Sequence, residues 1–330
     1  MQKTALAVII VGSVAILAPP TAAQAANTRS WVASFGNDAS PCTRVEPCAT
    51  FGHAVSQTNS GGEINCVDQG DFGGLQVIID RSITIDCEDV QARTTAPSTP
   101  GAPAILVTGP VEAVVTIRGL DINGNGVGGI GIATNGNAVL HIDKCFIHDF
   151  TGSNIGWGIQ VLAAPSTRLY VSDTVLADNG TSADGGGIDV LPFNVSNSIT
   201  KVVLNRVEAR NGFFGIKADA TNATGGVINM TIRDSVSSGN TANGIVGTGD
   251  AAGPAIVMMI DHSASSHNVA GFGVIADGPK TTIRLGGSSV TGNINGVGVS
   301  NGGVLQSYGN NQINGNSNDG IAALTPIGLH

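Results

Sequence analysis

The chain has 330 residues, of which 47 are glycine, and only 12% of its residues are charged, for a net charge of −9. Charged residues make up about 25% of a typical soluble domain, so the sparse and acidic balance excludes a basic nucleic-acid-binding surface as the main function. The content of 42% hydrophobic residues excludes a disordered chain, because it is enough to bury a large core.

The first 25 residues have the pattern of an export signal. Lys3 supplies a positive end, an apolar run extends from Ala5 to Ala18, and Ala23-Gln24-Ala25 offers small residues to a signal peptidase. The run is shorter than the ~20 residues of a membrane span. We therefore expect an exported protein (secreted, periplasmic or at the cell surface) with no membrane span after signal removal. The alternative is a signal that is kept as an anchor.

Export favours disulfide bonds among the five cysteines. Cys42 and Cys48 flank a short loop and are expected to pair. Cys66 and Cys87 end two similar strand-like runs, and if these runs lie on neighbouring coils their Cα atoms are ~4.8 Å apart, within reach of a disulfide. Cys145 is left over and is interpreted as a buried free thiol.

A glycine–aliphatic pair recurs along the chain at steps of 23 to 29 residues. Its copies are Gly129-Ile130, Gly158-Ile159, Gly187-Ile188, Gly215-Ile216, Gly244-Ile245, Gly273-Val274, Gly296-Val297 and Gly320-Ile321. Between them lie short runs of alternating apolar and polar residues that end in Asn or Gly turns, a pattern typical of short strands.

Three such strands per repeat, each too short to be stable alone, favour stacking of one repeat on the next. We predict an all-β fold: a right-handed single-stranded parallel β-helix with three short strands per coil and about nine to eleven coils. The expected organisation is a signal at 1–25, an N-terminal lead-in segment and cap at 26–60, and the parallel β-helix at 61–330. The Asn turns are expected to form hydrogen-bonded stacks.

Over about residues 60–325 this repeat resembles the pectin-lyase-like superfamily of right-handed β-helix proteins. Trp31–Asp38 and Pro47–Phe51 resemble the start of many exported bacterial β-helix proteins, and Gly309–Asn316 resembles their last coils. The resemblance implies the fold, but not one function, because the scaffold carries lyases, hydrolases, adhesins and phage tail proteins.

One short run, Ile260-Asp261-His262-Ser263, resembles a run that lies near the calcium site of pectate lyases, although Met259 replaces their Trp. In the repeat this position falls on a turn, and a turn is the interpretation that we favour. We expect no cofactor, and Ca²⁺ binding is the alternative. An acidic zone offers a second place for it: Asp68, Asp71, Asp86, Glu88 and Asp89.

The residue after each inward Ile or Val faces outward, on the sheet that in this superfamily forms the floor of the binding cleft. This outward column reads Gly131, Gln160, Asp189, Lys217, Val246, Ile275, Gly298 and Ala322. Its polar members, together with Asp219 two residues further on, form the candidate ligand-contact face: Gln160, Asp189, Lys217 and Asp219. Lys217 is expected to lower the pKa of both carboxyl groups, and a surface ion pair between coils is the simplest alternative.

Three functions remain open. The favoured hypothesis is a non-catalytic protein that binds a polysaccharide or cell-surface glycan. The first alternative is a polysaccharide lyase or inverting glycoside hydrolase, since Asp189 and Asp219 have a diagonal spacing of ~7–8 Å that inversion permits. The second is a structural or assembly protein. The walls of the cleft are expected from loops 148–156 and 191–198. Trp157, Phe193, Phe213 and Phe214 are expected to lie in loops that flank it.

Overall fold

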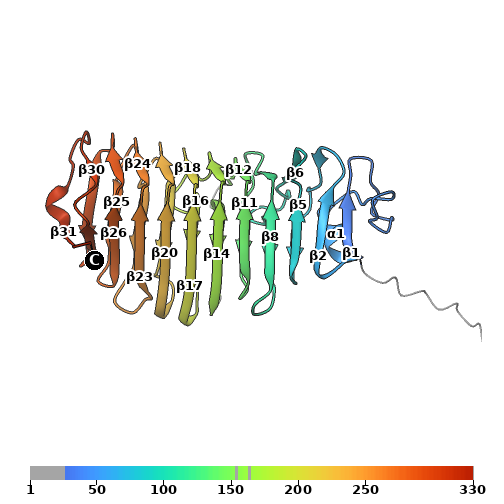
Figure 1. The fold of residues 1–330 in the computed structure, drawn as a ribbon, viewed down its shortest axis with the longest axis horizontal. Helices are drawn as coiled ribbons and strands as arrows, with labels where there is room; N and C mark the ends of the chain where they lie inside the picture. The colour runs from blue at the N-terminus through green and yellow to red at the C-terminus, as the bar shows by residue number, and fades with distance from the viewer. Residues whose placement is uncertain (1–26, 153–154, 163–164, 330) are drawn as a thin grey trace, which may run out of the picture.

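The computed structural model describes residues 27–152, 155–162 and 165–329, so the predicted signal lies outside the described residues. The chain winds into a rod of about nine coils, and each coil contributes one strand to each of three parallel sheets (Figure 1). The architecture is a right-handed parallel β-helix, as predicted.

Sheet 1 has twelve strands. In spatial order they are β1 (Asn27–Val32), β2 (Thr58–Cys66), β5 (Ile83–Asp86), β8 (Val114–Arg118), β11 (Val139–Asp143), β14 (Ser166–Ser172), β17 (Ser196–Asn205), β20 (Thr224–Arg233), β23 (Ala255–Asp261), β26 (Thr281–Gly286), β29 (Val304–Ser307) and β31 (Leu324–Pro326).

Sheet 2 has ten strands. They are β3 (Gly70–Asp71), β6 (Ala92–Thr95), β9 (Leu120–Asn123), β12 (Phe146–His148), β15 (Val175–Ala177), β18 (Glu208–Arg210), β21 (Val236–Ser238), β24 (Ala264–Ser266), β27 (Ser289–Thr291) and β30 (Gln312–Ile313).

Sheet 3 has nine strands and carries the candidate site. They are β4 (Val77–Ile79), β7 (Pro103–Val107), β10 (Ile130–Thr134), β13 (Gly156–Val161), β16 (Gly185–Val190), β19 (Phe214–Asp219), β22 (Ile245–Thr248), β25 (Phe272–Asp277) and β28 (Asn295–Ser300).

A short helix, which the repeat analysis missed, lies beside the first coil. Helix α1 (Phe51–Gln57) begins after Thr50, whose Oγ1 accepts a hydrogen bond from the backbone N–H of His53 at 3.2 Å. Phe51, Ala54 and Val55 are buried, so the helix adds its apolar face to the core. At the other end of the rod, a 3₁₀ turn, η1 (Ile321–Ala323), precedes the last strand.

The core is one continuous stack of aliphatic side chains inside the coils. The expected inward residues of sheet 3 are at most 1% exposed: Ile159, Ile188, Ile216, Ile245, Val274 and Val297. Their glycine neighbours also point inward, and at Gly244 an added Cβ would lie 2.2 Å from Ser265 Oγ and 2.6 Å from Asn268 Nδ2. The glycine–aliphatic pair therefore recurs because one coil corner has room for only one side chain.

The Asn turns form the expected stacks. Asn240, Asn268, Asn293 and Asn316 lie on successive coils, and each Nδ2 donates to the Oδ1 of the next residue at 2.8–2.9 Å. Asn268 is 2% exposed, so these bonds satisfy amides that water does not reach. The turn interpretation of Asp261-His262 also fits, because His262 has a φ of 45° directly after β23.

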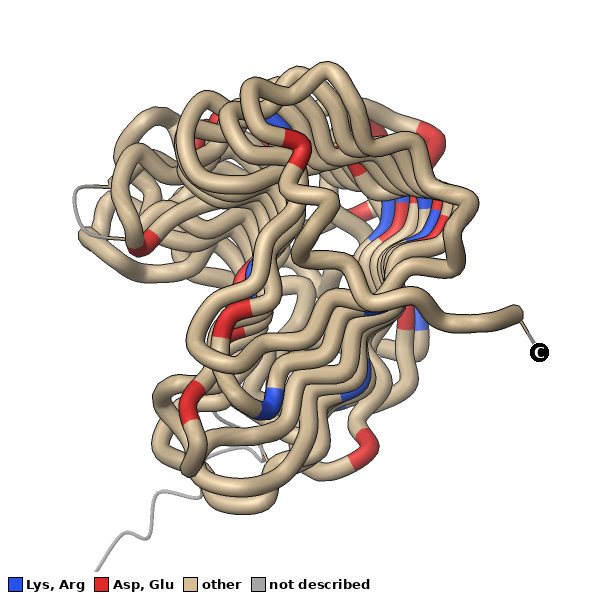
Figure 2. Tube along the Cα trace, turned by 90° about the vertical axis from the view of Figure 1, so that its left-hand side faces the viewer, with Lys and Arg blue, Asp and Glu red and all other residues tan. Residues whose placement is uncertain are grey.

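Charged residues form rows on the outside of the coils, and along these rows positive and negative positions alternate (Figure 2). Arg118 lies between Asp86 at 3.3 Å and Asp143 at 3.1 Å, one coil to each side. These side chains are partly exposed, so each such ion pair contributes at most about 1 kcal/mol.

Both predicted disulfides, Cys42–Cys48 and Cys66–Cys87, are present. Cys66 ends β2, Cys87 follows β5 on the next coil, and their Cα atoms are 5.2 Å apart. The bridge therefore fastens neighbouring coils near the N-terminal end. Cys145 is a buried free thiol.

Candidate functional site

A groove of about 580 Å³ lies on the outer face of sheet 3, across strands β7, β10, β13, β16 and β19. Its walls include Ile155 and, from the loop after β16, Leu191 and Phe193. At ~4.8 Å per strand, the five strands span about 19 Å along the rod. The groove contains the whole predicted ligand-contact face: Gln160, Asp189, Lys217 and Asp219.

Strand register places the outward column correctly for most of its length but not at its two ends. The predicted last member, Ala322, is wrong, because it lies in η1 and not in a strand of sheet 3. Gln160 pairs with Asp189, Asp189 with Lys217, and Lys217 with Val246. The predicted first member, Gly131, is wrong, because Ala133 pairs with Gln160. The run from Gly129 to Ile132 contains two Gly-Ile pairs, and hydrogen bonding aligns the second of them, Gly131-Ile132, with Gly158-Ile159.

The column faces away from the core, but it is not exposed as predicted. Exposure is 6% for Gln160, 2% for Asp189, 4% for Val246 and 8% for Ile275. Residues on neighbouring coils pack side by side along the column, and the groove walls rise above its polar part. Asp219 is 7% exposed as well, so the predicted face is a sheltered floor.

One of the two carboxylate oxygens of Asp189 is hydrogen-bonded to a described residue and the other is not. Gln160 Nε2 donates a hydrogen bond to Asp189 Oδ2 at 3.0 Å. Asp189 Oδ1 is buried and has no hydrogen-bond partner among the described residues. Burial raises the pKa of Asp189 from 3.8 to about 7, and this outweighs the lowering by the Lys217 charge and by the Gln160 hydrogen bond. Lys217 thus lowers the pKa of Asp189 as expected, but the net pKa is raised because burial has the larger effect.

Lys217 and Asp219 form an ion pair within one strand. The two residues are neighbours on the outer face of β19, and Lys217 Nζ lies 2.7 Å from Asp219 Oδ2. Asp219 Oδ1 also accepts hydrogen bonds from the N–H of Thr221 at 2.9 Å and from its hydroxyl at 2.6 Å. The expected ion pair between coils is thus replaced by a local one that engages both oxygens of Asp219.

The rest of the groove is mostly apolar. Trp157, Ile130 and Ala133 form a small buried cluster on the outer face, separate from the core inside the coils. The rings of Trp157 and Phe214 stack with centroids 6.3 Å apart, and Lys217 Nζ lies 5.3 Å from the centroid of Phe214.

The predicted positions of two aromatic residues need correction, because Trp157 lies within β13 and Phe214 within β19 rather than in loops. Among the described residues that line the groove, Phe193, 43% exposed, is the one that offers a large exposed ring surface at the rim.

Sequence reasoning missed several residues of the groove: Leu106, Ala133, Leu162, Asp184 and Asn222. Leu162 stands two residues after Gln160, so the alternation of the strand would have predicted it on the same face. Asp184 directly precedes β16, and Asn222 lies between β19 and β20. In such connections no alternation of apolar and polar residues is available to predict a position.

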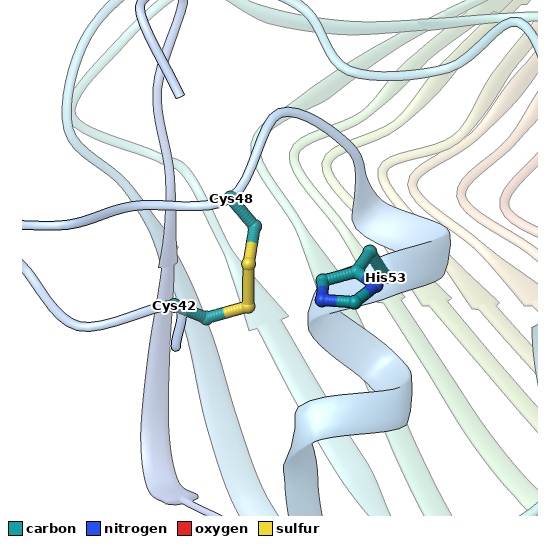
Figure 3. A group of neighbouring side chains, drawn as sticks. All are labelled: Cys42, Cys48 and His53. Atoms are coloured by element: carbon teal, nitrogen blue, oxygen red, sulfur yellow. A yellow bond between two sulfur atoms is a disulfide. The ribbon is translucent and has the colours of Figure 1, made fainter. Parts of the chain in front are cut away.

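Away from the groove, a group of potential metal ligands lies in the N-terminal cap. Cys42, Cys48 and His53 bring their ligand atoms within 4.8 Å of one another (Figure 3). The two sulfur atoms are joined in a disulfide, so neither is a thiolate that could bind a metal ion. Members of the acidic zone have other partners too: Glu88 is bonded to Lys144, and Asp71 accepts from Gly73 and Thr95.

No protein-family model matches the sequence, and no curated protein sequence matches it either. Solved structures with a similar fold include a rhamnogalacturonan lyase, with a TM-score of 0.54 and 14% identity over 81% of this chain and 75% of that one. A pectate lyase, Pel9A, has a TM-score of 0.47 and 13% identity over 90% and 81% of the two chains. The Dettilon tailspike protein has a TM-score of 0.46 and 12% identity over 83% and 63%.

The likeness to the rhamnogalacturonan lyase concerns the fold alone. Together with the three stacked parallel sheets, it supports a right-handed parallel β-helix. None of the helices in the described part of the chain has the length and apolar character needed to span a bilayer.

Proposed function

We propose that this protein is exported and binds a glycan in the groove of sheet 3 without cleaving it. The observation that carries the proposal is the groove itself, which is mostly apolar and has a few convergent polar groups at its floor. Its volume of about 580 Å³ lies within the 300–1,000 Å³ typical of ligand sites. The two disulfides fit an oxidising location, and the rhamnogalacturonan lyase with the same fold is named for a polysaccharide.

The state of Asp219 favours binding over cleavage. Inverting hydrolysis needs a general acid and a second carboxylate with a free oxygen to activate water. Asp219 has one oxygen paired with Lys217 and the other occupied by two hydrogen bonds from Thr221. Asp219 is therefore not a competent partner for Asp189 on the groove floor, and Asp184, the other carboxyl group of the lining, is exposed directly before β16.

Retention on immobilised neutral and acidic polysaccharides tests the proposal. Phe193→Ala removes the exposed ring at the rim and should weaken retention at least several-fold without changing the melting temperature. Phe146→Ala is the matched control, because Phe146 is 39% exposed but lies on sheet 2. If no polysaccharide is retained, or if both variants lose it equally, the groove is not a glycan site and a structural role gains support.

Cleavage is a second candidate because one observation favours it. A carboxyl group with a pKa of about 7 is suited to act as a general acid near neutral pH. An assay for new reducing ends and unsaturated ends on the retained polysaccharides separates the two functions. Turnover that disappears in Asp189→Asn, while retention persists, would replace the binding proposal with an enzymatic one.

A further inference from the structure

The hydrogen bond from Gln160 determines where Asp189 carries its proton. Because Gln160 Nε2 donates to Oδ2, that oxygen acts as an acceptor, and a proton on the carboxyl group belongs on Oδ1. Oδ1 is the buried atom without a partner, on a residue that lines the groove. Such an atom needs a hydrogen-bond partner to offset the loss of water. Protonated Asp189 therefore has one O–H donor that no described residue satisfies, on a residue that lines the groove.

The apolar side chains that line the groove with Asp189 favour one kind of hydrogen-bond acceptor. Leu162 and Leu191 stand two residues after Gln160 and Asp189 and line the same groove, and Ala133 lies one coil before Gln160. A sugar hydroxyl placed against these side chains would lose hydrogen bonds to water, at a cost in free energy. An acyl group presents a carbonyl oxygen to the donor and an apolar methyl to the walls.

The charges of the groove disfavour an acidic sugar. Asp184, Asp189 and Asp219 face a single cation, Lys217, which Asp219 already neutralises. Of these groups, the Lys217 charge lowers the pKa of Asp189, and Asp184 and Asp219 raise it. A uronate carboxylate would enter a site with excess negative charge and no free cation among the described lining residues.

We propose that the groove recognises a neutral sugar that carries an acetyl group, whose carbonyl oxygen accepts a hydrogen bond from Asp189 and whose methyl group packs against Leu162 and Leu191. This inference rests on the proposed glycan binding and adds the class of ligand to it. The acetyl group can be attached to nitrogen or to oxygen, and both present the same carbonyl and methyl groups.

Calorimetric titration with matched oligosaccharides tests the inference. Chitotriose against cellotriose isolates the N-acetyl group, and O-acetylated xylotriose against its alkali-deacetylated form isolates the O-acetyl group. At pH 6 at least one acetylated member should bind tenfold or more tightly than its unacetylated partner. Trigalacturonate should bind more weakly than that member. Equal affinities within both pairs, or preference for trigalacturonate, would overturn the inference while leaving glycan binding intact.

The pH profile and two variants separate the Asp189 donor from general packing. Between pH 6 and pH 8.5 the wild-type affinity for the acetylated ligand should fall at least tenfold, because Asp189 loses its proton. Asp189→Asn keeps an N–H donor and should bind with no such fall. Leu191→Ala should lower the preference for the acetylated ligand and keep the pH profile. If the affinity of Asp189→Asn falls with pH as it does in the wild type, or if none of these oligosaccharides binds, the inference is wrong. The proposed function is contradicted only if the wider polysaccharide panel is not bound either.

Discussion

Lys217 lies directly opposite Asp189 on the neighbouring strand, yet its ammonium group pairs with Asp219, two residues along its own strand, at 2.7 Å. Asp189 is left with a single hydrogen bond from Gln160. One groove therefore contains two aspartates in opposite situations: one is fully bonded and the other has an unsatisfied oxygen.

Asp189 should make the protein less stable as the pH rises. Its pKa of about 7 in the folded protein lies above the ordinary 3.8, so the folded state holds a proton that the unfolded state releases. The contribution of Asp189 to the free energy of unfolding is then highest below pH 4, falls between pH 4 and about 7, and levels off above that. A shift of about three pKa units corresponds to a loss of at most about 4 kcal/mol. Urea unfolding of wild type and Asp189→Asn at pH 5 and pH 8 measures this effect.

The Asp189→Asn variant should be the more stable protein at pH 8 and show a weaker pH dependence. Asp219→Asn is the matched control in the same groove, and it should be destabilised by about 1–3 kcal/mol at pH 8, because it loses the ion pair with Lys217. Equal pH dependence in wild type and Asp189→Asn would show that Asp189 does not retain its proton.

The period of the repeat predicts the fold because it reports on packing inside the coils. Ile159, Ile188 and Ile216 recur at matching positions since each fills the same corner of the core, and Cys66 and Cys87 fall on neighbouring coils for the same reason. The state of Asp189 is not visible in the period. Its burial depends on walls such as Leu191 and Phe193, and these come from irregular loops. Alternation gives the direction of a side chain and not what covers it.

The asparagine stack should contribute measurably to stability. Asn268→Ala removes the acceptor of Asn240 Nδ2 and the donor to Asn293 Oδ1, and it leaves buried polar groups without partners. We expect a loss of about 2–4 kcal/mol in the free energy of unfolding. Asn222→Ala, at an exposed position, is the control and should change it by less than about 0.5 kcal/mol. Similar values for both variants would show that the stack adds no stability.

The thiol of Cys145 should be unreactive in the folded protein. Burial raises its pKa to about 12, and only the thiolate reacts with disulfide reagents such as DTNB. At pH 8 we expect no labelling over an hour in buffer and one thiol per chain in denaturant, because the other four cysteines are bonded. Rapid labelling without denaturant would mean that this part of the core opens readily.

The bond between Cys66 and Cys87 should stabilise the N-terminal coils. It closes a loop with a sequence separation of 21, for which the chain-entropy estimate is about 3 kcal/mol. The double variant Cys66→Ala/Cys87→Ala should lower the free energy of unfolding by this order, and proteolysis should begin near residues 60–90. Cleavage that begins at the C-terminal coils, with unchanged stability, would contradict a role in fastening this end.

The strict register between coils also limits how the length of this protein can change. A duplicated coil inserted between β22 and β25 would add one step of ~4.8 Å to the rod and leave the groove residues as they are. The same duplication between β13 and β16 would separate Gln160 from Asp189 and leave the carboxyl group without its hydrogen-bond donor. Coils can thus be added in the C-terminal half without changing the site, whereas the five strands of the groove must stay adjacent and in the same order.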